Sequence, residues 1–350
     1  MVYDAIILIS GIVGVLFIVG ISIYPAFRVM PFAYGSARIR SARSRLLKDS
    51  ELRAFADQTY KDVIYQLEKK GYSELLDLKT EDFREELVQQ TLRRQSMQAL
   101  DKLSNHVPNG FKKFFSVLQN RHDYDFIMAV LRSKTNPFYG RHIIEALFVR
   151  TKTFTKKDRE DIEEMSLNDF ILRLKRTPYY ELIAEYTEDI NKGNLDEFER
   201  ALNKRYFDEL KSAARNDETL KAFVKLMIDN YNIRQGLSFE NAEFVGGGKL
   251  SKQRITRLSQ AKDIEDIKSA LEKTRYEPFI KECKTTFDIV KALFKIKKAF
   301  ANKLLTQEPL TIKPFVSYYI HKELELKNIR TVLKLIHAKF EPKEIAEAVI

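Results

Sequence analysis

Gly246-Gly247-Gly248-Lys249 is the stretch of the sequence that first suggests chemistry, because glycine-rich loops ending in lysine can cradle phosphate. The phosphate-loop pattern is Gly-x-x-x-x-Gly-Lys-Ser/Thr, whose last residue binds magnesium. Glu243 stands where the first glycine is required, and Leu250 where the hydroxyl is required. The motif therefore fails, and the three glycines indicate a flexible or sharply turning loop.

Metal and nucleophile sites are no better supported. His321 with Glu323 and Glu325 suggests a metal, but these spacings do not place the side chains on one helical face. The other histidines are scattered, and neither a His-Glu-x-x-His motif nor a Gly-x-Ser-x-Gly elbow occurs. Cys283 is the only cysteine, so it cannot form an intramolecular disulfide. The sequence predicts no catalytic residue, no cofactor and no metal ligand.

Basic side chains are in surplus, with 60 Lys and Arg against 49 Asp and Glu. They gather in two clusters, from Arg38 to Lys48 and from Lys291 to Lys303. Such clusters can bind nucleic-acid phosphates or anionic lipid headgroups. No nucleic-acid-binding signature accompanies them, so a lipid surface or an acidic partner protein is favoured and no nucleic acid is expected. A solvated face without a partner remains an alternative for each cluster.

The elements that would carry these residues are helices. Only 12 Gly and 9 Pro occur in 350 residues, too few turn residues for a β-sandwich or β-barrel. Thr155-x-x-Asp158 and Ser166-x-x-Asp169 are typical helix starts. Apolar residues recur at helical spacing in five stripes, namely Tyr60–Leu67 (ended by Gly71), Val88–Leu103 (stopped at Pro108), Phe111–Leu118, Ile289–Leu304 and Ile329–Phe340. The sequence predicts an all-α fold.

The first part of the chain predicts a membrane anchor. Ala5 to Phe27 contains no charged side chain, and about 20 apolar residues span a bilayer as a helix. Asp4 precedes the segment, whereas Arg28, Arg38 and further basic residues follow it. The positive-inside rule then places the N-terminus outside and the head on the cytoplasmic side of the cell membrane, as a single-pass, uncleaved anchor.

Three segments of the head resemble one another. Each has an acid, an Ile four residues later and a Leu four residues after that, and the acids are about 100 residues apart. These residues would share one helical face, and we interpret each acid as part of a first helical turn, where the helix dipole favours it. Asn precedes the Ile and Arg follows it in the second and third copies, while the first has Phe126 and Met128. The copies begin at Asp123, Asp229 and Glu325.

Further segments carry a family likeness, in order from Tyr34 to Ile350. They are Tyr34-x-x-Ala37-Arg38-x-Arg40-x-x-x-Ser44-x-Leu46-Leu47, Thr59-Tyr60-Lys61-Asp62, Leu67-Glu68-Lys69-x-Gly71-Tyr72, Phe244-Val245-Gly246-Gly247-Gly248 and Lys322-Glu323-Leu324-Glu325-Leu326-Lys327-Asn328-Ile329-Arg330. Together with the repeats they resemble the C subunit of archaeal-type (A/V-type) ATP synthases, a relative of the d subunit of vacuolar ATPases. Gly246 stands where the family usually has Pro.

The resemblance implies a non-catalytic rotor subunit of a proton- or sodium-translocating ATP synthase or ATPase. Its funnel-like head of three similar helical subdomains would couple the membrane proteolipid ring to the central-stalk subunits. We expect an anchor and link over 1–33 and a head over 34–350, with repeats around 34–140, 141–240 and 241–350 and the C-terminal helices able to pack on the first.

Partner contacts are expected at the polar residues of the resembling motifs. These side chains can instead cap and brace their own subdomains. A different function also stays open, that of a membrane-anchored basic helical adaptor that binds anionic lipid or nucleic acid. The expected partner-binding residues are Arg38, Arg40, Asn232, Arg234, Asn328 and Arg330.

Overall fold

The protein is built from helices. A computed structural model describes residues 29–78, 84–136, 141–151, 153–238 and 244–350. Every regular element in these ranges is an α- or 3-10 helix, which confirms the all-α prediction. Within the same ranges no helix has the length and apolar character that crossing a bilayer requires. The predicted anchor, Ala5 to Phe27, lies outside the described residues and stays a prediction.

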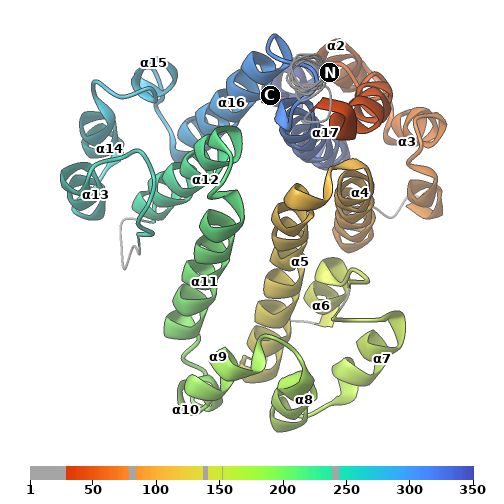
Figure 1. Ribbon diagram of the computed structural model, residues 1–350. Helices are drawn as coiled ribbons and strands as arrows, with labels where there is room; N and C mark the ends of the chain where they lie inside the picture. Colours follow the sequence, from red (N-terminus) through yellow and green to blue (C-terminus); the bar gives the residue numbers. More distant parts are fainter. Residues whose placement is uncertain (1–28, 79–83, 137–140, 152, 239–243) are drawn as a thin grey trace, which may run out of the picture.

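Long helices form the framework, and α5 and α11 run beside each other through the middle of the molecule (Figure 1). The helix pair α16 and α17 closes one end of this framework, and α17 also packs on α4. The long helices are α4 (Glu85–His106), α5 (Asn109–Thr135), α11 (Asp196–Ala214), α12 (Glu218–Gly236), α16 (Thr286–Leu305) and α17 (Lys313–His337).

Shorter helices form three groups around the framework (Figure 1). The first group follows helical residues 29–43 and comprises α2 (Asp49–Ala54), η1 (Phe55–Asp57), α3 (Tyr60–Lys69) and η2 (Ser73–Leu78). The second comprises α6 (Arg141–Leu147), α7 (Lys156–Glu164), α8 (Leu167–Arg173), η3 (Leu174–Arg176), α9 (Tyr180–Glu185) and α10 (Thr187–Asn191). The third comprises α13 (Lys252–Ser259), α14 (Ile264–Leu271) and α15 (Glu277–Ile280), and α18 (Pro342–Ala348) ends the series.

Three buried apolar clusters hold these groups together. The largest joins the long helices to α7–α10 and includes Phe114, Phe198 and Phe315. A second lies between α12, α13–α15 and the first half of α16. The third joins residues 47–92 to residues 326–349, so that segments from opposite ends of the described chain share one core.

The helix signals in the sequence locate most elements correctly. Ser166 caps α8 by accepting a hydrogen bond from the Asp169 N–H at 3.2 Å, as that spacing predicts. The terminal stripe extends too far, because α17 ends at His337 and Phe340 is exposed. Lys339 has φ 57°, a left-handed conformation that stops the helix before Pro342 begins the next one.

The interpretation of the repeated acids as first-turn residues is wrong. Asp123, Asp229 and Glu325 lie in the middle of α5, α12 and α17, several turns from the helix starts. Each is at least 96% buried, which a dipole-stabilised surface carboxylate would not be. A buried carboxylate needs hydrogen-bond donors, so these acids must be bonded to other elements.

Candidate functional site

Each repeated acid is linked to a tyrosine from one of the short-helix groups, directly in the first two repeats and through Lys322 in the third. Asp123 accepts a 2.7 Å hydrogen bond from the Tyr179 hydroxyl, and Asp229 accepts one of 2.9 Å from Tyr276. In the third repeat, Lys322 Nζ donates to both Tyr72 Oη and Glu325 Oε2, at 2.7 Å each. Burial, followed by the charge of the neighbouring acid, raises the pKa of all three tyrosines. We refer to these three acid–tyrosine pairs as latches.

The tyrosines belong to a second repeat, which the pattern of acids does not reveal. Each follows a helix capped by a hydroxyl or carboxylate, with an Asp three residues after the cap and a buried Leu five residues before the Tyr. The three cap, Asp, Leu and Tyr sets have the same spacing. They are Thr59, Asp62, Leu67 and Tyr72; Ser166, Asp169, Leu174 and Tyr179; and Asp263, Asp266, Leu271 and Tyr276.

Asn232 and Asn328, two of the expected partner-binding residues, are buried against their own chain. Asn232 bonds both the N–H and the C=O of Val245, at 2.8 and 2.9 Å. Asn328 bonds the N–H and C=O of Ile350 in the same way, at 3.0 and 3.1 Å. Phe126 occupies the equivalent position of the first repeat and packs among other phenylalanines instead. The two amides brace the fold, and their contact with a partner stays a prediction.

The expected arginines do not gather at one site. Arg38 and Arg40 are exposed on helical residues 29–43, where Arg38 Nε donates to Tyr34 Oη at 2.9 Å. Arg330 is exposed on α17 and bonds Glu85 at 2.8 Å. Arg234, near the end of α12, lines a hollow within the described part of the chain.

This central hollow, of about 410 Å³, lies where α5, α11, α12, α16 and α17 meet. Arg121, Met227 and Glu323 line it, and each stands two residues before the acid of its repeated helix. The repeated helices therefore turn their acids toward the tyrosines of the latches. They turn the residues two positions before those acids toward one shared hollow. Its remaining wall combines aromatic and aliphatic residues, Phe294 and Tyr319 among them, with as many charged and amide side chains.

Three ion pairs, two of which share Asp125, organise the charges around the hollow. Arg121 contacts Asp125 at 2.9 Å and Asn203 at 2.7 Å, and Arg93 contacts the same Asp125 at 3.1 Å. Burial alone would raise the pKa of Asp125, but the charges of Arg121 and Arg93 hold it below its ordinary value. Lys297 forms the third pair, with Glu323, at 2.8 Å.

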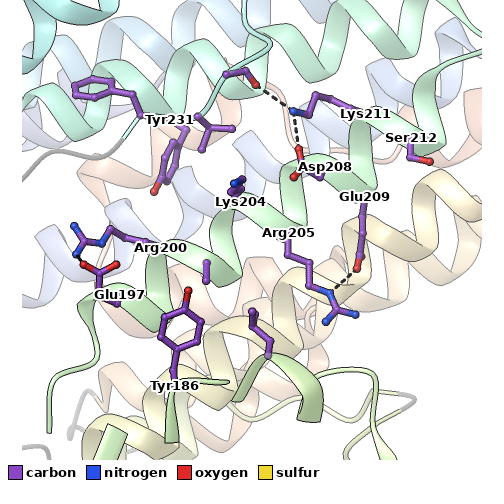
Figure 2. Close-up of a pocket in the computed structure, with 15 residues that line it drawn as sticks. Tyr186, Glu197, Arg200, Lys204, Arg205, Asp208, Glu209, Lys211, Ser212 and Tyr231 are labelled. Carbon is purple, nitrogen blue, oxygen red and sulfur yellow. Dashed lines mark hydrogen bonds and ion pairs between the residues drawn. The ribbon is translucent and has the colours of Figure 1, made fainter. Parts of the chain in front are cut away.

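A larger depression of about 1030 Å³ follows α11 and reaches the 244–246 loop (Figure 2). Most of its charges are paired, since Arg205 contacts Glu209 at 3.0 Å and Lys211 contacts Asp208 at 2.7 Å. Lys211 also donates to the Gly246 carbonyl at 3.2 Å. The side chains that line this surface do not combine a nucleophile, a base and oxyanion donors.

The glycine run beside this depression is a tight turn rather than a phosphate cradle. Gly247 has φ 102°, and a Cβ on Gly248 would lie 2.0 Å from Asp229 Oδ1. That carboxylate oxygen accepts the N–H groups of Lys249 and Leu250, at 2.8 and 3.1 Å. The amides that could bind phosphate therefore bind the acid of the second latch.

The basic helix α16 also uses its lysines internally. Lys298 contacts Asp49 at 2.5 Å and the Ile350 carbonyl at 2.8 Å, while Lys291 donates to the Glu347 carbonyl. Such pairing leaves fewer cations for nucleic acid or lipid. Among the described residues no cluster of His, Cys, Asp and Glu is arranged to hold a metal ion.

Comparison with known proteins gives one consistent result. The model of the family described as ATP synthase (C/AC39) subunit matches residues 36–348. The C subunit of the A-type ATP synthase of Methanocaldococcus jannaschii is 24% identical over 344 residues, covering 91% of this chain and 86% of the relative. The corresponding C subunits of Thermococcus kodakarensis and Pyrococcus furiosus are 26% and 23% identical, each covering 92% of this chain and 91% of the relative.

The match covers nearly all of the described helices, including the three repeated helices and the elements that hold their tyrosines. The likeness seen in the short motifs thus extends over most of the sequence. The chain belongs to the ATP synthase (C/AC39) subunit family.

Proposed function

We propose that this chain is a non-catalytic rotor subunit of an A/V-type proton- or sodium-translocating ATP synthase or ATPase. In this role the head is a socket that couples the membrane proteolipid ring to the central stalk, whose base enters the central hollow. The observation that carries the proposal is the convergence of α5, α12 and α17 on that hollow through equivalent positions, Arg121, Met227 and Glu323. Family membership supports the assignment to a rotary complex.

A socket that transmits torque must resist shear between its parts. The three latches support this requirement, because each ties a long helix to a short-helix group at a buried carboxylate, directly in the first two repeats and through Lys322 in the third. We take the head to consist of three subdomains, around 34–140, 141–240 and 241–350, with one latch for each repeat. The core shared by residues 47–92 and 326–349 would close the ring of subdomains.

The position of the head at the membrane is the second part of the proposal. Residues 29–43 continue directly from the predicted anchor, Ala5 to Phe27, whose apolar composition suits contact with lipid. An anchor so close to the head would enter the lipid-filled lumen of the proteolipid ring, with the N-terminus outside. Crosslinks from Val15 or Phe17 to the inner face of the ring would support this placement, and crosslinks to outer lipid or stator alone would contradict it.

Purification of the native complex tests the function. We expect the full chain, tagged and extracted in mild detergent, to copurify with proteolipid and stalk subunits, and nuclease treatment to leave this association intact. The alternative role, a membrane-anchored basic adaptor, predicts that nucleic acid or anionic lipid copurifies and that rotary subunits are absent. The internal pairing of Lys291, Lys297 and Lys298 weighs against that alternative.

A further inference from the structure

Two cations at the central hollow have no acidic partner within the described part of the chain. Arg234 is exposed near the end of α12 and makes neither a hydrogen bond nor an ion pair with those residues. Lys327, on α17, is partly buried beside the hollow rather than in its wall, and its ammonium group lies 3.1 Å from the centroid of the Phe294 ring, which does line the hollow. A cation–π contact of this kind does not neutralise the charge. Arg121 and Lys297, which also line the hollow, are already paired with acids.

The surroundings of Lys327 favour an incoming anion. Burial first, and then the charge of Arg234, lower the pKa of Lys327 to about 7. Lys297, on α16, acts in the same direction, whereas Glu323, on α17, opposes them but is itself bound to Lys297. An anion placed between Arg234 and Lys327 would relieve the repulsion between the two cations and keep Lys327 protonated.

The hollow also contains an unsatisfied polar group. Asn230 lines it and is 7% exposed, yet its Oδ1 has no hydrogen-bond partner among the described residues. Its Nδ2 is 3.5 Å from the Leu293 carbonyl, at the limit of a hydrogen bond. A buried amide oxygen without a donor is costly, so a partner that brings an N–H group would gain by pairing with it.

We propose that the central hollow binds an acidic polypeptide segment, with one carboxylate held between Arg234 and Lys327 and an N–H group donated to Asn230 Oδ1. This inference rests on the proposed function and deepens it by naming the chemistry of the stalk segment that enters. A polypeptide is favoured over a free anion because the wall also includes Phe207 and Tyr319, which apolar side chains of the same segment would contact.

Charge-removing variants test the proposal, with the stalk subunits that copurify with the chain as the probe. We expect Arg234→Gln and Lys327→Gln each to weaken stalk binding by about tenfold, the typical effect of losing one charge-assisted hydrogen bond. Lys334→Gln is the matched control, because Lys334 is a cation of the same helix as Lys327 but is exposed and bonds Glu85 at 3.3 Å. It should bind the stalk as the unaltered chain does.

The pH dependence of binding is a second readout. Since Lys327 is charged below its pKa, stalk binding should weaken between about pH 6 and about pH 8.5, and Lys327→Gln should remove most of this change. Because Arg234 is exposed, Arg234→Gln should fold normally, and its melting temperature would verify this.

The results that would overturn the inference are distinct from those that would overturn the proposed function. Absence of stalk subunits from the purified complex would contradict both. Stalk binding that is unchanged in Arg234→Gln and Lys327→Gln, or equally weakened in Lys334→Gln, would contradict only the carboxylate clamp. If millimolar inorganic phosphate displaced the stalk subunits from the hollow, the site would be one for free anions. That result would also overturn the inference.

Discussion

Asn232 and Asn328 occupy the same position in two repeated helices, and each holds a distant stretch of backbone by the same two hydrogen bonds. Asn232 pairs with Val245, which leads into the glycine turn, and Asn328 pairs with Ile350. An amide is suited to this task because it both donates to a carbonyl and accepts from an N–H. The second and third repeats thus share the hydrogen bonding of this asparagine to a distant backbone segment, in addition to the pattern of helical residues.

Loss of either amide should therefore destabilise the fold. Asn328→Ala leaves the buried Ile350 N–H without its partner, and Asn232→Ala leaves the partly buried N–H and C=O of Val245 without theirs, so we expect the free energy of unfolding to fall by about 2–3 kcal/mol. Asn105→Ala, at an exposed position of α4, should change it by less than about 0.5 kcal/mol. Denaturant titration measures all three, and equal values for Asn105 and Asn328 would refute the bracing role.

The glycine turn allows a comparison between neighbours. Gly248→Ala would push a methyl group into the Asp229 carboxylate, so we expect a loss of more than about 2 kcal/mol in stability. The methyl group of Gly246→Ala meets no atom of the described residues within 4 Å, so this variant should change stability by less than about 1 kcal/mol. Thermal melting of both variants distinguishes a tight turn from a flexible loop, for which the two would behave alike.

The contribution of the latches to stability can be tested by removing single tyrosine hydroxyl groups. Tyr179→Phe removes the hydroxyl that donates to buried Asp123 and should cost about 1–2 kcal/mol, whereas Tyr180→Phe, next to it, should cost little. Tyr276→Phe should resemble Tyr179→Phe, because Asp229 has the same arrangement. Chemical denaturation gives the three values, and a latch has no energetic role if Tyr179→Phe matches Tyr180→Phe.

Low pH should lower the free energy of unfolding, in part because Asp125 becomes protonated. Its pKa is lowered in the folded state, so its stabilising effect is complete above the ordinary Asp value of about 3.9 and is lost as the pH falls through the folded value. Asp125→Asn should therefore cost about 2–4 kcal/mol near neutral pH, where it leaves Arg93 and Arg121 without their acid.

The free energy of unfolding, measured from about pH 7 to about pH 2.5, tests whether the pKa of Asp125 is lowered in the folded state. The difference in stability between the unaltered chain and Asp125→Asn should shrink below about pH 4. A difference that stays constant with pH, or grows in acid, would show that the carboxylate does not have a lowered pKa.

Local patterns in the sequence predict much of the fold. Helical spacing, caps such as Ser166 and breaks such as Pro108 depend on neighbouring residues and are visible in the sequence itself. The acids form a recognisable repeat, but their mid-helix burial could not be inferred, since it depends on tyrosines far along the chain. Tyr72 meets Lys322, which holds the α17 acid, only because segments from opposite ends share a core.

The candidate site is harder to predict for the same reason. Lys298 and Lys327 look equivalent in the sequence, yet Lys298 is neutralised by Asp49 while Lys327 lies over an aromatic ring. Whether a cation is free depends on which elements pack around it. The spacing of Thr59 and Tyr72, shared with Ser166 and Tyr179, is the local signal from which the latches could have been predicted.

Site-specific photocrosslinking from the hollow tests the central claim, that this chain is the socket for the central stalk. A photoreactive residue at Gln235 would face the hollow, and one at Ser212, beside the α11 depression, would serve as the control. In the intact complex we predict that Gln235 crosslinks to a stalk subunit and that Ser212 does not. Crosslinks to the stalk from Ser212 but none from Gln235 would contradict the account.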